Sequence, residues 1–195
     1  MSGCSKQRFR YGSALLYKLI DSLGNYRFFS FIYKSYIKTL PINGNETILD
    51  FGCGSGAGSK HLAKILSKEG GKLFCVDISK YWMKIARKRL GKFNNVKFLI
   101  GQLPDLNFKN KSFDIIYIFY ALHDVEPNLR NGIVNEFAKI LKDDGKIIIK
   151  EPQRKNDGMP ISEIINLMTT NGLIEKESVK KKDSYAGIFL KNDLQ

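Results

Sequence analysis

The stretch I-L-D-F-G-C-G-S-G-A-G-S-K-H-L-A-K, residues 48–64, decides how the fold is built. It places four glycines, at alternate positions from 52 to 58, between an apolar run and a segment with helical spacing. A turn from a strand into a helix needs backbone angles that glycine tolerates, and missing Cβ atoms let a ligand approach the main chain. The helix start at Ser59 adds free N–H groups. The stretch therefore predicts a strand, a ligand-binding turn and a helix.

Short apolar runs alternate with helical patterns along the rest of the chain, which predicts a mainly parallel sheet with helices on both faces. A final helix and two strands joined by a short turn predict an antiparallel hairpin at the end. The expected fold class is α/β, a Rossmann-like doubly wound sheet of seven strands. The predicted strands are 47–51, 73–77, 96–100, 113–119, 146–150, 173–179 and 185–191, and the predicted helices are 59–66, 79–90, 129–141 and 161–170.

Composition limits the class of protein. The chain has 195 residues, 43% of them hydrophobic, which suits one ordinary core. The longest apolar run, 113–122, is about half of the roughly 20 residues that span a bilayer, so we expect a cytoplasmic protein without membrane insertion. Cys4, Cys53 and Cys75 lack metal-ligand spacing, and no metal site is expected.

The formal net charge of +13 has two interpretations. It could attract an anionic partner such as RNA, or it could reflect lysines that solvate the surface. The lysines are scattered along the whole chain, which favours the second interpretation. RNA remains a possible partner, and the sequence does not indicate an oligomeric state.

The glycine turn predicts the kind of ligand. Ligands of open α/β sheets bind beyond the carboxyl ends of the strands, and this first turn belongs to that crevice. Asp50, at the mouth of the strand, would repel the pyrophosphate of NAD but would suit a ligand with an ammonium group, such as S-adenosylmethionine (SAM). Asp77 lies at the end of the next predicted strand, where a carboxylate can bind both ribose hydroxyls of either ligand. The G-x-G-x-x-A pattern of Gly52, Gly54 and Ala57 is by itself weak evidence.

Five motifs in order carry a family resemblance: D-F-G-C-G-S-G, V-D-I at 76–78, G-Q-L-P at 101–104, F-D-I-I-Y-I-F-Y-A-L-H and L-K-D-D-G-K-I-I-I-K-E-P. Over about residues 45–191 the chain resembles the class I SAM-dependent methyltransferases. It is most similar to the methyltransferase type 11-like group that includes the quinone-biosynthesis C-methyltransferases.

The resemblance implies a set of cofactor-binding residues. Asp50 and the glycine backbone would hold the methionine part of SAM, Asp77 the ribose, and Ile78 and Leu103 the two faces of the adenine. Gln102 stands where many relatives have an aspartate that binds the adenine amino group, and Phe119 would lie near the sulfonium. The predicted set is Asp50, Gly52, Cys53, Gly54, Gly56, Asp77, Ile78, Gln102, Leu103, Phe119, Tyr11 and Tyr17.

The two N-terminal tyrosines belong to this set as members of a lid. Residues 1–40 are rich in aromatic side chains and are predicted to form two helices, and by analogy with relatives they would cover the cofactor. We therefore expect a helical lid segment, residues 1–40, followed by a SAM-binding methyltransferase domain, residues 41–195.

The expected activity is transfer of a methyl group from SAM to a small-molecule acceptor, with S-adenosylhomocysteine (SAH) as product. Positioning of the acceptor supplies much of the catalysis, and a base is needed only if the acceptor loses a proton. His123, in the loop after the fourth predicted strand, is the candidate catalytic residue; alternatively, it packs that loop beside Asp124. Three other functions stay open: a methyltransferase that acts on RNA or protein, an NAD-dependent oxidoreductase, and a non-catalytic SAM-binding module.

Overall fold

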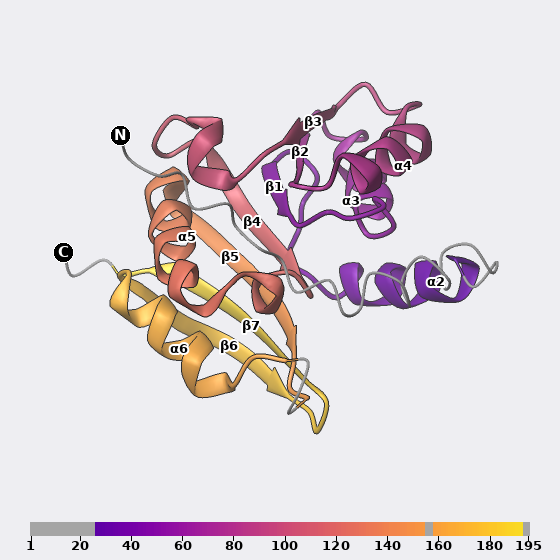
Figure 1. The fold of residues 1–195 in the computed structure, drawn as a ribbon. Helices are drawn as coiled ribbons and strands as arrows, with labels where there is room; N and C mark the ends of the chain where they lie inside the picture. The colour runs from indigo at the N-terminus through magenta and orange to yellow at the C-terminus, as the bar shows by residue number, and fades with distance from the viewer. Residues whose placement is uncertain (1–25, 155–157, 193–195) are drawn as a thin grey trace.

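The computed structural model describes residues 26–154 and 158–192, and within these ranges the strands form one seven-stranded sheet between two layers of helices (Figure 1). The strands are β1 (Thr47–Phe51), β2 (Lys72–Asp77), β3 (Val96–Ile100), β4 (Phe113–Phe119), β5 (Leu141–Pro152), β6 (Leu173–Lys180) and β7 (Ser184–Lys191). The helices are α2 (Tyr26–Ile37), α3 (Ser59–Leu66), α4 (Lys80–Leu90), α5 (Pro127–Ile140) and α6 (Ile161–Thr170), with short 3-10 turns η1 (Leu103–Leu106) and η2 (Leu122–Asp124).

The sheet has the strand order β3-β2-β1-β4-β5-β7-β6. The first five strands pair in parallel, and β7 pairs antiparallel with both β5 and β6. The predicted fold class is therefore confirmed, including the terminal hairpin. The element ends differ most in two places: α5 begins at Pro127, which suits the first turn of a helix, and β5 begins directly after α5, at Leu141.

Two apolar cores lie on the two faces of the sheet. Side chains alternate along each strand, so that Tyr117 joins the core under α2, α3 and α4 whereas the next residue, Ile118, joins the core under α5 and α6. The same alternation applies at the end of β5, where Ile148 and Ile149 belong to opposite cores. Successive residues of a strand therefore point to opposite faces of the sheet, and each side chain packs under the helices of its own face.

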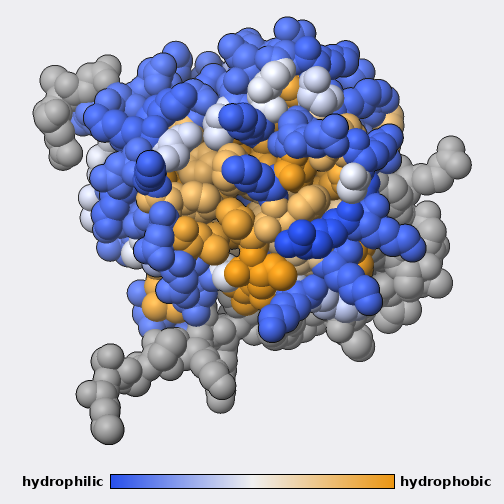
Figure 2. All heavy atoms as spheres, turned by 90° about the horizontal axis from the view of Figure 1, so that it is seen from above, coloured by the Kyte–Doolittle hydropathy of each residue, from blue (hydrophilic) through white to orange (hydrophobic). Residues whose placement is uncertain are grey.

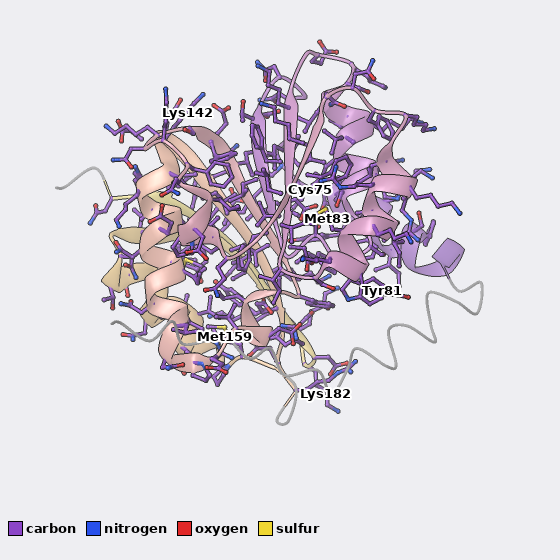
Figure 3. All side chains as sticks on the ribbon, turned by 45° about the horizontal axis from the view of Figure 1, so that its top comes forward. Cys75, Tyr81, Met83, Lys142, Met159 and Lys182 are labelled. Atoms are coloured by element: carbon purple, nitrogen blue, oxygen red, sulfur yellow. The ribbon has the colours of Figure 1, made fainter. Side chains whose placement is uncertain are left out.

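The order of the strands reverses between β1 and β4, which is the switch point where ligands of such sheets bind. Register places Phe51 beside Ile118 and Phe119 beside Lys150. Gly52, Phe119 and Lys150 therefore lie in a row across three neighbouring strands, at their carboxyl ends. Figure 3 shows the two ends of the strands, with Lys142 near the amino ends and Met159 and Lys182 near the carboxyl ends. The row of Gly52, Phe119 and Lys150 lies at the carboxyl ends.

Viewed from the amino ends of the parallel strands, the surface has a hydrophobic centre surrounded by hydrophilic residues (Figure 2). A cavity of about 660 Å³ lies at this edge, lined among others by Lys72, Lys92 and Lys97. It is at the end of β2 and β3 that faces away from the glycine turn. No helix within the described ranges is both long and apolar enough to cross a bilayer.

Asp114 fastens the beginning of the central strands. One carboxylate oxygen accepts a hydrogen bond from the Thr47 backbone N–H at 2.8 Å, and the other accepts one from Lys142 Nζ at 2.6 Å. The side chain therefore connects β1, β4 and β5 at the edge opposite the glycine turn.

We expect Asp114→Ala to lower the free energy of unfolding by about 1–3 kcal/mol, because the Thr47 N–H loses its partner. Urea denaturation measures the change. Asp143→Ala is the matched control, because that exposed carboxylate pairs with the surface lysines Lys111 and Lys191 and its removal should not change stability measurably. Equal stability of the two variants would contradict the role of Asp114.

Candidate active site

The glycine turn leaves β1 and is held against β2. Gly52, Gly54 and Gly56 have φ values of 69°, 52° and 75°, the left-handed region that favours glycine. The backbone N–H groups of Gly52 and Cys53 both donate to the Val76 carbonyl, at 2.9 and 3.1 Å. The turn is therefore fixed to the neighbouring strand before the chain enters α3.

The three glycines have different surroundings. A Cβ atom on Gly52 would collide with the Cβ of Ala121, in the loop after β4, and one on Gly56 would meet Leu90 Cδ1 at 2.9 Å. A Cβ atom on Gly54 would have no protein atom within 4 Å. Packing against Ala121 thus requires glycine at position 52, and Gly56 lies close against α4, whereas Gly54 borders open space that a ligand could fill.

Two carboxylates lie close together at the glycine turn. Asp50 is buried and accepts a hydrogen bond from Ser59 Oγ at 2.5 Å. Asp77 accepts hydrogen bonds from the backbone N–H groups of Gly54 and Ser79, both at 2.8 Å. Within residues 26–154 and 158–192, neither carboxylate forms an ion pair with a Lys, Arg or His side chain.

Burial dominates the electrostatics of both groups. It raises the pKa of Asp50 to about 7, opposed by the Ser59 hydrogen bond and reinforced by the nearby charge of Asp77. Burial also raises the pKa of Asp77, opposed by its backbone hydrogen bonds. Two carboxylates without a counterion among the described residues favour a cationic ligand group and disfavour a phosphate.

A buried hydroxyl lies beside this acidic pair. Tyr117 is the cross-strand neighbour of Asp50, and its phenol oxygen has no hydrogen-bond partner within the described part of the chain. Burial raises the Tyr117 pKa, and Asp50, Tyr36 and Tyr33 add to the effect. The hydroxyl is therefore a neutral donor next to Asp50 that a polar ligand group could use.

The loop after β4 carries His123, whose ring is held from two sides. Nδ1 lies 2.6 Å from Glu151 Oε2, and Nε2 lies 3.5 Å from Asp124 Oδ1. Glu151 favours the proton on Nδ1, which would leave Nε2 as the basic nitrogen. Because Nε2 faces Asp124, the ring or the Asp124 carboxylate would have to move before Nε2 could accept a proton from an acceptor.

Glu151, near the end of β5, contacts this loop and is the site residue that sequence reasoning missed. Its side chain is fully buried, and Oε1 accepts hydrogen bonds from the backbone N–H groups of Ala121 and Leu122, at 3.1 and 2.8 Å. Arg130 completes the bracing, since its guanidinium donates to the carbonyls of Val125 and His123. An acidic residue at the carboxyl end of an apolar strand was the available signal.

The remaining predicted residues are distributed around the same edge. Phe119 ends β4, and its ring lies 4.7 Å from Tyr33 and 5.4 Å from Tyr36, both on α2. Ile78 and Gln102 are partly exposed just beyond β2 and β3, and Cys53 lies within the turn. Leu103, which begins η1, is only 1% exposed and packs in the core. Tyr11 and Tyr17 lie outside the described residues.

The fold and this site define a class of protein: a doubly wound α/β protein whose switch-point crevice suits a nucleoside ligand with a cationic tail. A family model described as a methyltransferase domain matches residues 49–149, which include the glycine turn, Asp77 and His123. The chain belongs to this methyltransferase domain family.

Two relatives illustrate the similarity in sequence. The chain is 32% identical over 114 residues to a demethylmenaquinone methyltransferase of Tropheryma whipplei, a match that covers 58% of this chain and 45% of that protein. It is 27% identical over 174 residues to a carboxy-S-adenosyl-L-methionine synthase of Ruthia magnifica, covering 84% of this chain and 73% of the relative. The chain thus spans less than half the length of the first of these relatives.

Solved structures support the fold. A SAM-dependent methyltransferase from Aquifex aeolicus superposes with a TM-score of 0.68 at 18% identity, covering 80% of this chain and 88% of that one. At this level of identity the likeness concerns the fold.

The glycine turn gives a prediction about stability. Gly52→Ala should lower the free energy of unfolding by more than the ~1–2 kcal/mol of left-handed backbone strain, because its Cβ collides with Ala121. Gly54→Ala is the matched control, which has similar backbone strain but open space around its Cβ. Urea denaturation compares the two, and equal destabilisation would show that the Ala121 contact does not matter.

Proposed function

We propose that the protein is a SAM-dependent methyltransferase that transfers a methyl group to a small-molecule acceptor in the cytoplasm, with SAH as product. The observation that carries the proposal is the pair of neighbouring carboxylates, Asp50 and Asp77, at the glycine turn, with open space beside Gly54. SAM carries an ammonium and a sulfonium group and no phosphate, so this acidic crevice suits it better than NAD. Membership in the methyltransferase domain family supports the same conclusion.

The residues at the crevice fit the parts of SAM. Asp50 would bind the ammonium group, directly or through water, and the Tyr117 hydroxyl beside it could donate to the carboxylate of the same amino-acid tail. Asp77, at the end of β2, already accepts backbone hydrogen bonds at both oxygens and would also accept hydrogen bonds from the ribose hydroxyls. Ile78 and Gln102 follow β2 and β3, where the base would lie.

Catalysis would rest mainly on positioning. When bound, SAM supplies an electrophilic methyl group on its sulfonium, and the protein's task is to align the acceptor with it. The loop from Tyr120 to Val125 suits this task because Glu151 and Arg130 fix its backbone. With its ring in the present position, His123 would orient the acceptor. It would act as a base only after its ring had separated from Asp124.

The distribution of charge favours a small acceptor over RNA. Residues 59–100 hold eleven Lys and Arg residues against two carboxylates, and three of these cations line the cavity at the amino ends of β2 and β3. That cavity is at the opposite edge of the sheet from the glycine turn. RNA bound there would be far from the methyl group.

The N-terminal segment would act as a lid. Tyr33 of α2 packs against the start of α3, where a Cβ on Gly58 would meet its ring at 3.0 Å, and Ser30 Oγ lies 2.9 Å from His61 Nε2. In Figure 1, α2 lies beside the end of β4. These contacts support a lid formed by residues 1–40, with Tyr11 and Tyr17 as its further members.

Isothermal titration calorimetry tests the proposed ligand. SAH should bind the full chain and NAD should give no heat. Asp77→Ala should weaken SAH binding about tenfold or more, because two hydrogen bonds to a charged group are lost. Asp105→Ala, which removes an exposed carboxylate on η1, is the control. Binding of NAD in preference to SAH would refute the proposal. Circular dichroism checks that the two variants remain folded.

Asp50 gives the binding a predictable pH dependence. In the free protein its pKa is raised to about 7, and an ammonium ligand would favour the ionised form. Protons therefore compete with the ligand below pH 7, and the Kd for SAH should rise about tenfold for each pH unit lost. Calorimetry between about pH 5.5 and 7 measures this slope. Asp50→Asn should bind more weakly but without the slope; a pH-independent Kd in the unmodified protein would contradict the role of Asp50.

A further inference from the structure

Lys150, near the end of β5, holds an ammonium group in aromatic surroundings at the carboxyl edge of the sheet. Its Nζ lies 4.5 Å from the ring centre of Tyr36, 5.3 Å from that of Phe119 and 5.9 Å from that of Tyr120. Within residues 26–154 and 158–192, no carboxylate pairs with it. Aromatic faces stabilise a cation only partly, so the charge still favours an anion.

The electrostatic surroundings make this ammonium group a receptive partner for a negative charge. Burial lowers the pKa of Lys150, and the nearby charge of Lys181, in the turn between β6 and β7, lowers it further. Glu151 is the next residue, but strand alternation sends its carboxylate to the other face, where it binds His123 and two backbone N–H groups. An anionic group beside Nζ would offset both the cost of burying the ammonium charge and its repulsion by Lys181.

The position of Lys150 relates it to the methyl donor. Gly52, Phe119 and Lys150 lie in one row across β1, β4 and β5, and neighbouring strands are about 4.8 Å apart. The backbone of Lys150 is therefore about 10 Å from the glycine turn, with Phe119 between them. Lys150 and the glycine turn therefore lie at the same carboxyl edge of the sheet, close enough for one acceptor to approach both.

We propose that Lys150 binds the acceptor, and that the acceptor is a planar molecule with an oxyanion conjugated to its ring, such as a phenolate or an aromatic carboxylate. The rings of Tyr36, Phe119 and Tyr120 contact its faces or edges, and the Lys150 ammonium group pairs with its oxygen. This inference rests on the proposed function, which it deepens by naming the class of acceptor.

The chemistry balances without a basic side chain of the protein. An electron pair of the oxyanion, or of a ring carbon conjugated with it, forms the bond to the methyl carbon. The bond between that carbon and sulfur breaks, and its electron pair returns to sulfur. The negative charge of the acceptor and the positive charge of the sulfonium cancel in this step. After attack by ring carbon, the displaced ring proton leaves to solvent. Lys150 orients the oxyanion and is not consumed.

The test uses the full chain and four nitroaryl probes: the anions 4-nitrophenolate and 4-nitrobenzoate, neutral 4-nitroanisole, and cationic 4-nitrobenzylammonium. Binding is measured by NMR titration with and without saturating SAH. At least one of the two anions should bind more tightly than the neutral and cationic probes. Whichever anion binds more tightly indicates whether the acceptor is a phenolate or a carboxylate.

Two substitutions test Lys150 itself. Lys150→Met should weaken binding of the tighter anion about tenfold, as for the loss of a hydrogen bond to a charged group, and should leave the neutral probe unchanged. Lys150→Arg should retain most of the anion affinity. Lys146→Met is the matched control, because Lys146 lies on the same strand and face but binds the Pro41 carbonyl at the other end.

The outcomes separate this inference from the proposed function. Unchanged anion binding in Lys150→Met, an equal loss for the neutral probe, or an equal loss in Lys146→Met overturns the role of Lys150. SAH should bind Lys150→Met as tightly as the unmodified protein. Failure of SAH to bind the unmodified protein refutes the proposed donor instead, and the titrations without SAH still decide whether Lys150 binds the anion.

Discussion

The close contact between Gly52 and Ala121 sets the distance between the two loops that form the crevice. It exists because β1 and β4 are neighbours at the point where the strand order reverses. Neither loop could approach so closely with a larger residue at position 52. Once this contact is made, Asp50 and Asp77 lie on one side of the crevice, and the braced loop that carries His123 lies on the other.

Opposite charges lie at the two ends of the row that crosses this contact. Asp50 and Asp77 form an acidic end near β1 and β2, and Lys150 forms a cationic end on β5, with aromatic rings between them. Methyl transfer from a sulfonium to an oxyanion joins a cation and an anion. The arrangement would hold each reactant by the charge opposite to its own and would disfavour the reversed orientation.

Periodicity and turn chemistry were enough to predict most of the fold from the sequence. Apolar runs and the glycine turn predicted the strands and the terminal hairpin, because each is determined by a short local pattern. The predicted site residues from Asp50 to Asp77 lie at or just beyond the carboxyl ends of β1 and β2, so their meeting also follows from parallel pairing. Glu151 and Lys150 could not be placed in this way. Their roles depend on contacts with residues 28 or more positions away, such as His123 and Tyr36.

The adjacent pair Lys150 and Glu151 shows how one strand can serve two functions at a single edge. Because side chains alternate, Lys150 points to the α2 face and Glu151 to the α5 face. Pairing with β4 on one side and with β7 on the other fixes this register, since Lys150 lies between Phe119 and Ala186. A slip of one residue would exchange the two charges, placing a carboxylate among the rings and an ammonium group against the N–H donors of the His123 loop. The antiparallel β7 strand therefore also keeps the acceptor side of the crevice cationic.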